Sequence, residues 1–125
     1  MKDEKYWEDL GRRAVACEGW RWVPGMLTVS GHRCVDVMND GIMWSERRCG
    51  GWNWKDAVTA IPDLCDPATV GCLLALVREK HGPEAHTEPT GGGRWEFHAD
   101  AEAWGGICKD TEAEALVSAL EQVER

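Results

Sequence analysis

The chain has 125 residues, which fits one domain and leaves no room for two, so residues 1–125 are expected to form a single domain. Its net charge of −8 opposes general nucleic-acid binding, which draws affinity from clustered lysine and arginine. The apolar fraction of 43% argues against disorder, and no apolar stretch is long enough to cross a bilayer.

The first predicted element is a helix over residues 3–18. Its apolar residues recur every three or four positions and form one stripe of Trp7, Leu10, Ala14 and Cys17. Gly19 is a natural stop for this helix. The charged residues 1–5 contain no apolar signal-peptide core, so the protein is expected in the cytoplasm of the cell that makes it.

Strands are expected next, over residues 26–29, 33–38 and 42–44. Asn39, Asp40 and Gly41 tolerate the positive φ angles of a tight hairpin turn, so the last two of these strands are predicted to pair. The polar, glycine-interrupted residues 45–60 are predicted to form a loop that leads into a short strand at 57–61.

Two further helices are predicted from their ends. Asp66 can cap the second helix, Pro67 suits its first turn, and Gly82 can end it. Its broad apolar stripe predicts a central position in the core, with Val70, Leu73, Leu74, Leu76 and Val77 as members. The last helix begins at Thr111, which forms a capping box with Glu114.

The segment between these helices is expected to hold a long loop and two strands. Residues 82–93 are rich in proline and glycine, and we interpret them as a loop. Residues 94–99 alternate as a half-buried strand does, and 104–109 is its expected partner. The predicted fold is α+β: an antiparallel sheet of about four to five strands with helices on one face, in the order α-β-β-β-α-β-β-α.

The chain has six cysteines and four histidines. Because no secretion signal is present, the cysteines are expected to be buried free thiols in a reducing cytosol, and the spacing of both residue types predicts no metal site. The nearest approaches to ligand pairs are His32 with Cys34, Cys65 with Cys72, and His81 with His86. No cofactor motif is present, and His98 on the 94–99 strand is a candidate general base without a recognisable nucleophile beside it. The sequence therefore predicts no catalytic residue, no metal and no cofactor.

Tryptophan usage is the most unusual feature, with eight Trp against one Phe and one Tyr. Two Trp-x-Trp pairs lie in polar, loop-like segments near arginines. Exposed Trp and Arg dominate protein-interface hot spots, and they also stack on bases. The alternative is that these rings cover the core edge. The candidate tryptophan–arginine surface comprises Trp20, Arg21, Trp22, Arg47, Arg48, Trp52 and Trp54.

Several stretches together carry a resemblance: Trp20-Arg21-Trp22-Val23-Pro24-Gly25-Met26, Ile61-Pro62-Asp63-Leu64, the helix at 66–79, and residues 111–117. The pattern resembles a group of small uncharacterised proteins encoded by tailed bacteriophages and prophages. The resemblance implies an accessory viral protein that acts in a host bacterial cytoplasm, and it carries over no catalytic residue.

Three functional hypotheses follow. The first is a non-enzymatic phage accessory protein that binds a host protein, such as a defence component, and inhibits it through the tryptophan–arginine surface. The second is a protein that sequesters a nucleotide or another small molecule and counteracts bacterial immune signalling; tryptophan rings would stack on the base, and Arg33, Arg47 or Arg48 would meet a phosphate. The third, ranked last, is a small enzyme that uses His98 or a cysteine–histidine pair. No membrane partner is expected, and homo-oligomerisation is left open.

Overall fold

The computed structural model describes residues 3–29, 31–38, 41–45, 52–55, 60–99 and 107–122, with backbone alone at residues 38, 41, 44, 45 and 52–55. The helices are α1 (Glu4–Val15), α2 (Pro67–His81) and α3 (Glu112–Glu121). The strands are β1 (Arg33–Met38), β2 (Gly41–Ser45), β3 (Trp52–Lys55), β4 (His86–Pro89), β5 (Trp95–His98) and β6 (Ile107–Lys109). The α+β class and the alternation of helices with antiparallel strands are confirmed.

Helices α2 and α3 begin at the predicted caps, and α1 begins after a cap, Asp3, that was not predicted as one. The carboxylate of Asp3 accepts a hydrogen bond from the Tyr6 amide, Asp66 accepts one from Thr69, and Thr111 accepts one from Glu114. Helix α2 ends at Gly82, whose φ of 110° is easily reached by glycine. Helix α1 ends three residues before the predicted Glu18, because the chain turns tightly after Val15.

The central helix is α3, and the prediction that α2 is central is wrong. Helix α3 packs against α1, α2 and all three strands of the second sheet. Its buried residues surround the helix axis: Ala113, Ala115, Leu116, Val117, Ala119 and Leu120. Helix α2 buries one side only, which includes Leu73, Leu76 and Val77. Small alanines let α3 approach several neighbours at once, and the apolar stripe alone does not show this.

The strands form two antiparallel sheets of three strands each, in place of the single predicted sheet. In the first sheet β1 pairs with β2 as the hairpin signal predicted, with a bulge between Cys34 and Asp36. The loop predicted at 45–60 was wrong in part, since β3 lies within it and pairs with β2. The predicted strand at 26–29 forms only single bridges, from Leu27 to Arg33 and from Thr28 to Pro62.

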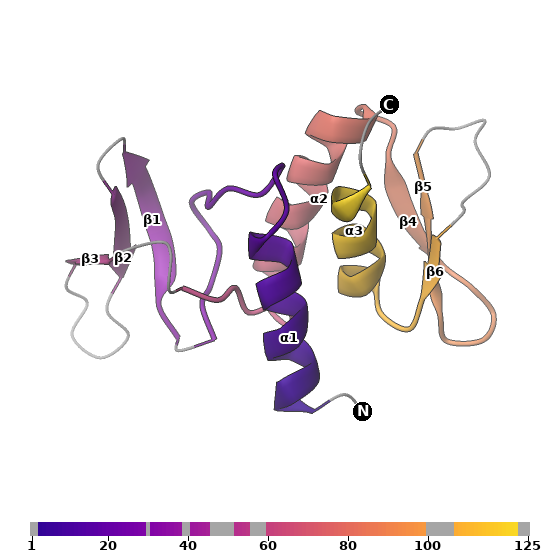
Figure 1. Cartoon of the computed structure of the whole chain (residues 1–125), viewed down its shortest axis with the longest axis horizontal. Coiled ribbons are helices and arrows are strands. Elements are labelled where there is room, and N and C mark those ends of the chain that lie inside the picture. Colours follow the sequence, from indigo (N-terminus) through magenta and orange to yellow (C-terminus); the bar gives the residue numbers. More distant parts are fainter. Residues whose placement is uncertain are drawn as a thin grey trace.

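The second sheet has the order β4-β5-β6. The predicted pairing of the last two strands is confirmed over Trp95–Lys109 and Phe97–Ile107. The loop prediction for residues 82–93 was wrong at β4, which pairs with β5 along its whole length. Proline stands at the end of β4, where a missing amide is tolerated at a sheet edge. Figure 1 shows the helices between the two sheets.

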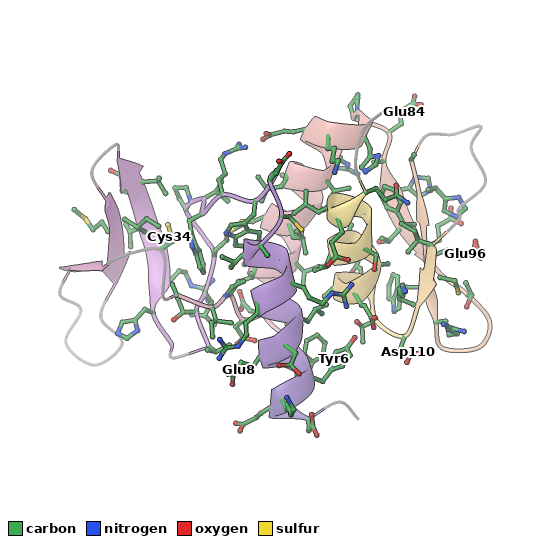
Figure 2. All side chains as sticks on the ribbon, in the orientation of Figure 1. Tyr6, Glu8, Cys34, Glu84, Glu96 and Asp110 are labelled. Atoms are coloured by element: carbon green, nitrogen blue, oxygen red, sulfur yellow. The ribbon has the colours of Figure 1, made fainter. Side chains whose placement is uncertain are left out.

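Helix α1 closes onto α3 through polar contacts. The Tyr6 hydroxyl donates a hydrogen bond to Glu114 at 2.7 Å, and Figure 2 places Tyr6 on the lower half of α1. The Arg13 guanidinium bonds to Glu121 at 2.7 and 3.0 Å. Apolar contacts of Leu10 and Ala14, both buried, continue this interface. The first and last helices are therefore joined although they are far apart in sequence.

The described cysteines are all free thiols, as expected, but Cys65 and Cys108 are exposed where burial was predicted. Cys34 is buried, and burial raises the pKa of its thiol to about 11. Cys49 lies outside the described residues. None of the helices in the described part of the chain combines the length and apolar character that crossing a bilayer requires.

Candidate metal centre

One face of the β4–β5 hairpin gathers two histidines and two glutamates. The register places His86 opposite His98 and Glu88 opposite Glu96. Alternate strand residues face opposite sides of a sheet, so these four share one face. Phe97 on the other face is buried, and Thr87 donates a hydrogen bond to Glu112 of α3. The four side chains therefore occupy the face turned away from α3, where Glu96 is visible in Figure 2.

Three of these side chains bring their donor atoms to one place. The ligand atoms of His86, Glu88 and His98 all lie within 4.8 Å of one another. Nε2 of His86 is 3.2 Å from Oε1 of Glu88, and Nε2 of His98 is 3.7 Å from Oε2 of the same carboxylate. Ligands about 2.0–2.2 Å from a tetrahedral zinc ion are separated by about 3.3–3.6 Å, so these spacings suit a shared ion.

The hydrogen bond behind His86 fixes which nitrogen faces the site. Its Nδ1 lies 2.9 Å from the backbone carbonyl oxygen of Glu84. A carbonyl only accepts, so Nδ1 carries the hydrogen, and in the neutral ring Nε2 presents a lone pair. That lone pair would face the Glu88 carboxylate, another acceptor, whereas the protonated ring donates a hydrogen bond to Glu88 across 3.2 Å. A proton or a metal cation between them relieves this opposition, and a carbonyl behind the ring is the usual support of a metal-binding histidine.

His98 gives a second indication of a cation site. Its side chain is 19% exposed, and its Nε2 is buried without a hydrogen-bond partner in the described part of the chain. This nitrogen lies 3.5 Å from Glu96 and 3.7 Å from Glu88, outside hydrogen-bond geometry but within the reach of an ion pair. Buried polar atoms are normally satisfied, so an orphan nitrogen between two carboxylates calls for a partner.

The chemical types of the three ligands favour some metal ions over others. Two imidazoles and a carboxylate are the ligand set of many zinc sites. The same set in an open arrangement also suits ferrous iron, while calcium and magnesium prefer oxygen ligands alone. Zinc fits best, because tetrahedral spacing matches the observed donor separations and imidazole is among its preferred ligands.

Only the first part of the predicted tryptophan–arginine surface, Trp20, Arg21 and Trp22, has described side chains. Trp22 is 5% exposed and belongs to the core, so its expected surface position was wrong. Trp20 is half-buried and meets Trp22 edge-on, with ring centroids 5.4 Å apart. These two rings follow the alternative of covering the core edge, because an apolar ring gains more free energy from packing in the core than from contact with water.

The structure describes the remaining members of that surface to different extents. Arg21 is exposed and pairs with Glu79 at 2.6 Å, so its charge is already compensated. Trp52 and Trp54 are alternate residues of β3, whose backbone alone is described. Arg47 and Arg48 lie outside the described residues. The described contacts therefore neither join nor separate the two Trp-x-Trp pairs.

A hollow of about 670 Å³ lies where α1, α2 and α3 end, lined among others by Arg13, Cys17, Lys80 and Glu121. Its cations have partners: Arg13 pairs with Glu121, and Lys80 donates to the carbonyl of Leu120 at 2.8 Å. Arg33, expected to meet a phosphate, bonds instead to the Gly25 carbonyl and to Asp66. Nucleotide sequestration stays an untested prediction.

Sequence reasoning missed the metal centre because it assigned β4 to a loop. The signal was present as a mirrored pair, His-Thr-Glu at 86–88 and Glu-Phe-His at 96–98. Alternation in two paired strands places such residues on one face, but it requires both segments to be strands. The considered pairing of His81 with His86 is not formed, since His81 Nε2 bonds to the Ala119 carbonyl at 2.8 Å.

Comparisons of this chain with known protein families, with curated proteins and with solved structures found no match. The resemblance to phage-encoded proteins stays a prediction.

Proposed function

We propose that this protein binds a divalent transition metal, zinc foremost, through His86, Glu88 and His98. The carrying observation is that the donor atoms of these three side chains all lie within 4.8 Å of one another. The carbonyl of Glu84 orients His86 from behind, which prepares the ring for coordination. The site lies on a short hairpin backed by the buried Phe97, so its ligands stand on regular strands.

Isothermal titration with zinc, after treatment with a chelator, tests this proposal. The expected stoichiometry is one ion per chain. The background is the double variant Cys65→Ser and Cys108→Ser, since exposed thiols bind zinc on their own. In that background His86→Ala and His98→Ala are expected to weaken binding by at least roughly tenfold.

His32→Ala serves as the matched control, because His32 is half-buried and lies before β1, outside the second sheet. Its variant is expected to bind zinc as the background does. If the background protein binds no zinc, or if His86→Ala and His98→Ala leave its affinity unchanged, the site is refuted.

A second candidate function is binding of a host protein, as the resemblance suggests. The favouring observation is that β3 is an edge of the first sheet as described, in the order β1-β2-β3, and carries Trp52 and Trp54. Unpaired strand edges are templates for a partner strand, and tryptophan is frequent at interface hot spots. Val37 of β1 is 41% exposed on the same sheet.

Cross-linking in a host lysate, with the wild type beside Trp52→Ala and Trp54→Ala, tests the second function. A specific partner is expected to be captured by the wild type and lost with both variants, and Arg12→Ala, on the exposed side of α1, serves as a surface control. Equal capture by the wild type and the tryptophan variants would contradict a binding surface on β3.

A further inference from the structure

Zinc sites that serve structure are filled by four protein ligands, whereas catalytic sites keep one position open. The group of His86, Glu88 and His98 supplies three. We propose that Glu96 supplies the fourth ligand, so that four side chains surround the zinc ion and link β4 to β5. This inference rests on the zinc binding proposed above and specifies which kind of site it is.

The position of Glu96 supports this role. It stands directly opposite Glu88 in the register of β4 and β5. Its Oε1 lies 3.5 Å from Nε2 of His98, a separation that matches two ligands of one tetrahedral ion. Its side chain is 38% exposed, which leaves it room to turn. Glu96 lies outside the group of three, and a change of its side-chain rotamer brings the carboxylate to the remaining position.

Cys108 is the competing ligand on the same face. It stands opposite Glu96 in the register of β5 and β6, and its side chain is exposed. The strand β6 is separated from β4 by β5, so adjacent-strand spacing puts Cys108 about 10 Å from the β4 ligands. That distance exceeds the span of one coordination sphere. Cys108 is therefore a matched control for Glu96.

A closed site has a structural consequence for β4. This strand is only four residues long and forms the edge of the second sheet. One face is fixed by the hydrogen bond from Thr87 to Glu112, at 2.6 Å. On the other face, ligands from both strands bind one ion, which joins β4 to β5 through side chains as well as backbone. Bound zinc thus holds β4 in place on β5 and leaves no coordination position for a substrate.

Cobalt(II) substitution tests this closure, because cobalt absorbs visible light strongly in tetrahedral sites and weakly in sites expanded by water. The wild type is expected to give the strong tetrahedral spectrum. Glu96→Gln is expected to lose most of that absorption and to bind zinc at least roughly tenfold more weakly in competition with a chelating dye. Cys108→Ser is expected to match the wild type in both measurements.

Hydrogen exchange adds an independent readout. Zinc is expected to slow exchange of the β4 amides in the wild type and in Cys108→Ser, but much less in Glu96→Gln. Tight binding by Glu96→Gln with an unchanged cobalt spectrum would overturn the fourth ligand and leave zinc binding intact. Absence of cobalt and zinc binding in the wild type would instead refute the proposed function itself.

Discussion

The imidazoles of His86 and His98 stack face to face across β4 and β5, with centroids 5.1 Å apart and planes 13° from parallel. The register of the two strands places them opposite each other. The Glu88 carboxylate reaches the Nε2 atoms of both rings. The Nε2 atoms of both rings thus lie beside one carboxylate, and the proposed zinc binding depends on this arrangement.

Zinc is expected to stabilise the fold, because a ligand that binds only the folded state shifts the unfolding equilibrium. When the free zinc concentration is one hundred times the dissociation constant, the free energy of unfolding rises by about 2.7 kcal/mol. Thermal unfolding should therefore show a higher Tm with zinc and a return to the original Tm after chelation. His98→Ala should show no zinc-dependent change, and a shift of wild-type size in this variant would place the metal elsewhere.

Gly11→Ala and Gly71→Ala are expected to have opposite effects on stability. A Cβ at Gly11 would lie 2.7 Å from both Cγ2 of Ile61 and the carbonyl oxygen of Pro62. Gly11→Ala should therefore lower the free energy of unfolding by about 1–3 kcal/mol. A Cβ at Gly71, in the middle of α2, meets nothing within 4 Å. Gly71→Ala should therefore raise the free energy of unfolding by up to about 1 kcal/mol. Urea unfolding of both variants measures the difference, and equal effects would contradict the packing of α1 on residues 61–62.

The Tyr6 hydroxyl is expected to lose its proton at a higher pH than an ordinary tyrosine does. Burial raises its pKa to about 12, and the hydrogen bond to Glu114 adds to this while the one to Thr111 opposes it. The neutral form is favoured in the fold, so this contribution to stability is complete below the ordinary pKa near 10 and is lost as the pH rises toward 12. The chain has one tyrosine, so its ultraviolet absorbance reports this group directly. A midpoint near 10 in the folded protein would contradict the α1–α3 contact.

The Asp66 cap is expected to weaken in acid. Partial burial raises the pKa of Asp66, but hydrogen bonds from Arg33 and Thr69 outweigh it and lower the pKa below its usual value. The stabilisation is therefore present above the unfolded pKa near 4 and is lost as the pH falls through the lower folded value. Asp66→Ala should cost roughly 0.5–2 kcal/mol at neutral pH. The cost should shrink in acid, and a cost that stays constant with pH would argue against the cap.

Trp22→Ala is expected to destabilise the protein by about 3–5 kcal/mol, because removal of a buried ring leaves a cavity. Trp22→Phe, which keeps most of the apolar volume, should cost less. Denaturant midpoints measure both, with Arg21→Ala as a neighbouring surface control expected to change little. An unchanged midpoint for Trp22→Ala would restore Trp22 to the candidate surface.

The predictable parts of this fold are those decided by neighbouring residues. Asp66 with Pro67, and Thr111 with Glu114, set helix starts through contacts within one turn, so the sequence predicts them. The hairpin of β1 and β2 is likewise set by its turn residues. Strand β4 contains His86, Thr87 and Glu88 without an apolar residue, so its strand state depends on pairing with β5.

The candidate metal centre was missed for the same reason. His86 and His98 are twelve positions apart, and only the pairing of their strands brings them together. The burial of Trp22 also follows from packing, since its polar neighbours in sequence suggest a surface. The hydrophobic stripe of α2 looked central by itself, but α3 is central because its alanines let other elements approach.

The contact of Tyr6 with Glu114 spans 108 positions of the chain. During synthesis at about 5–20 residues per second, α1 leaves the ribosome roughly 5–20 s before the helix that covers it. Residues 61–62, which also pack on α1, are made earlier, but over that interval α1 lacks its contact with α3. Completion of the core therefore waits for translation to reach α3, the last helix of the described chain.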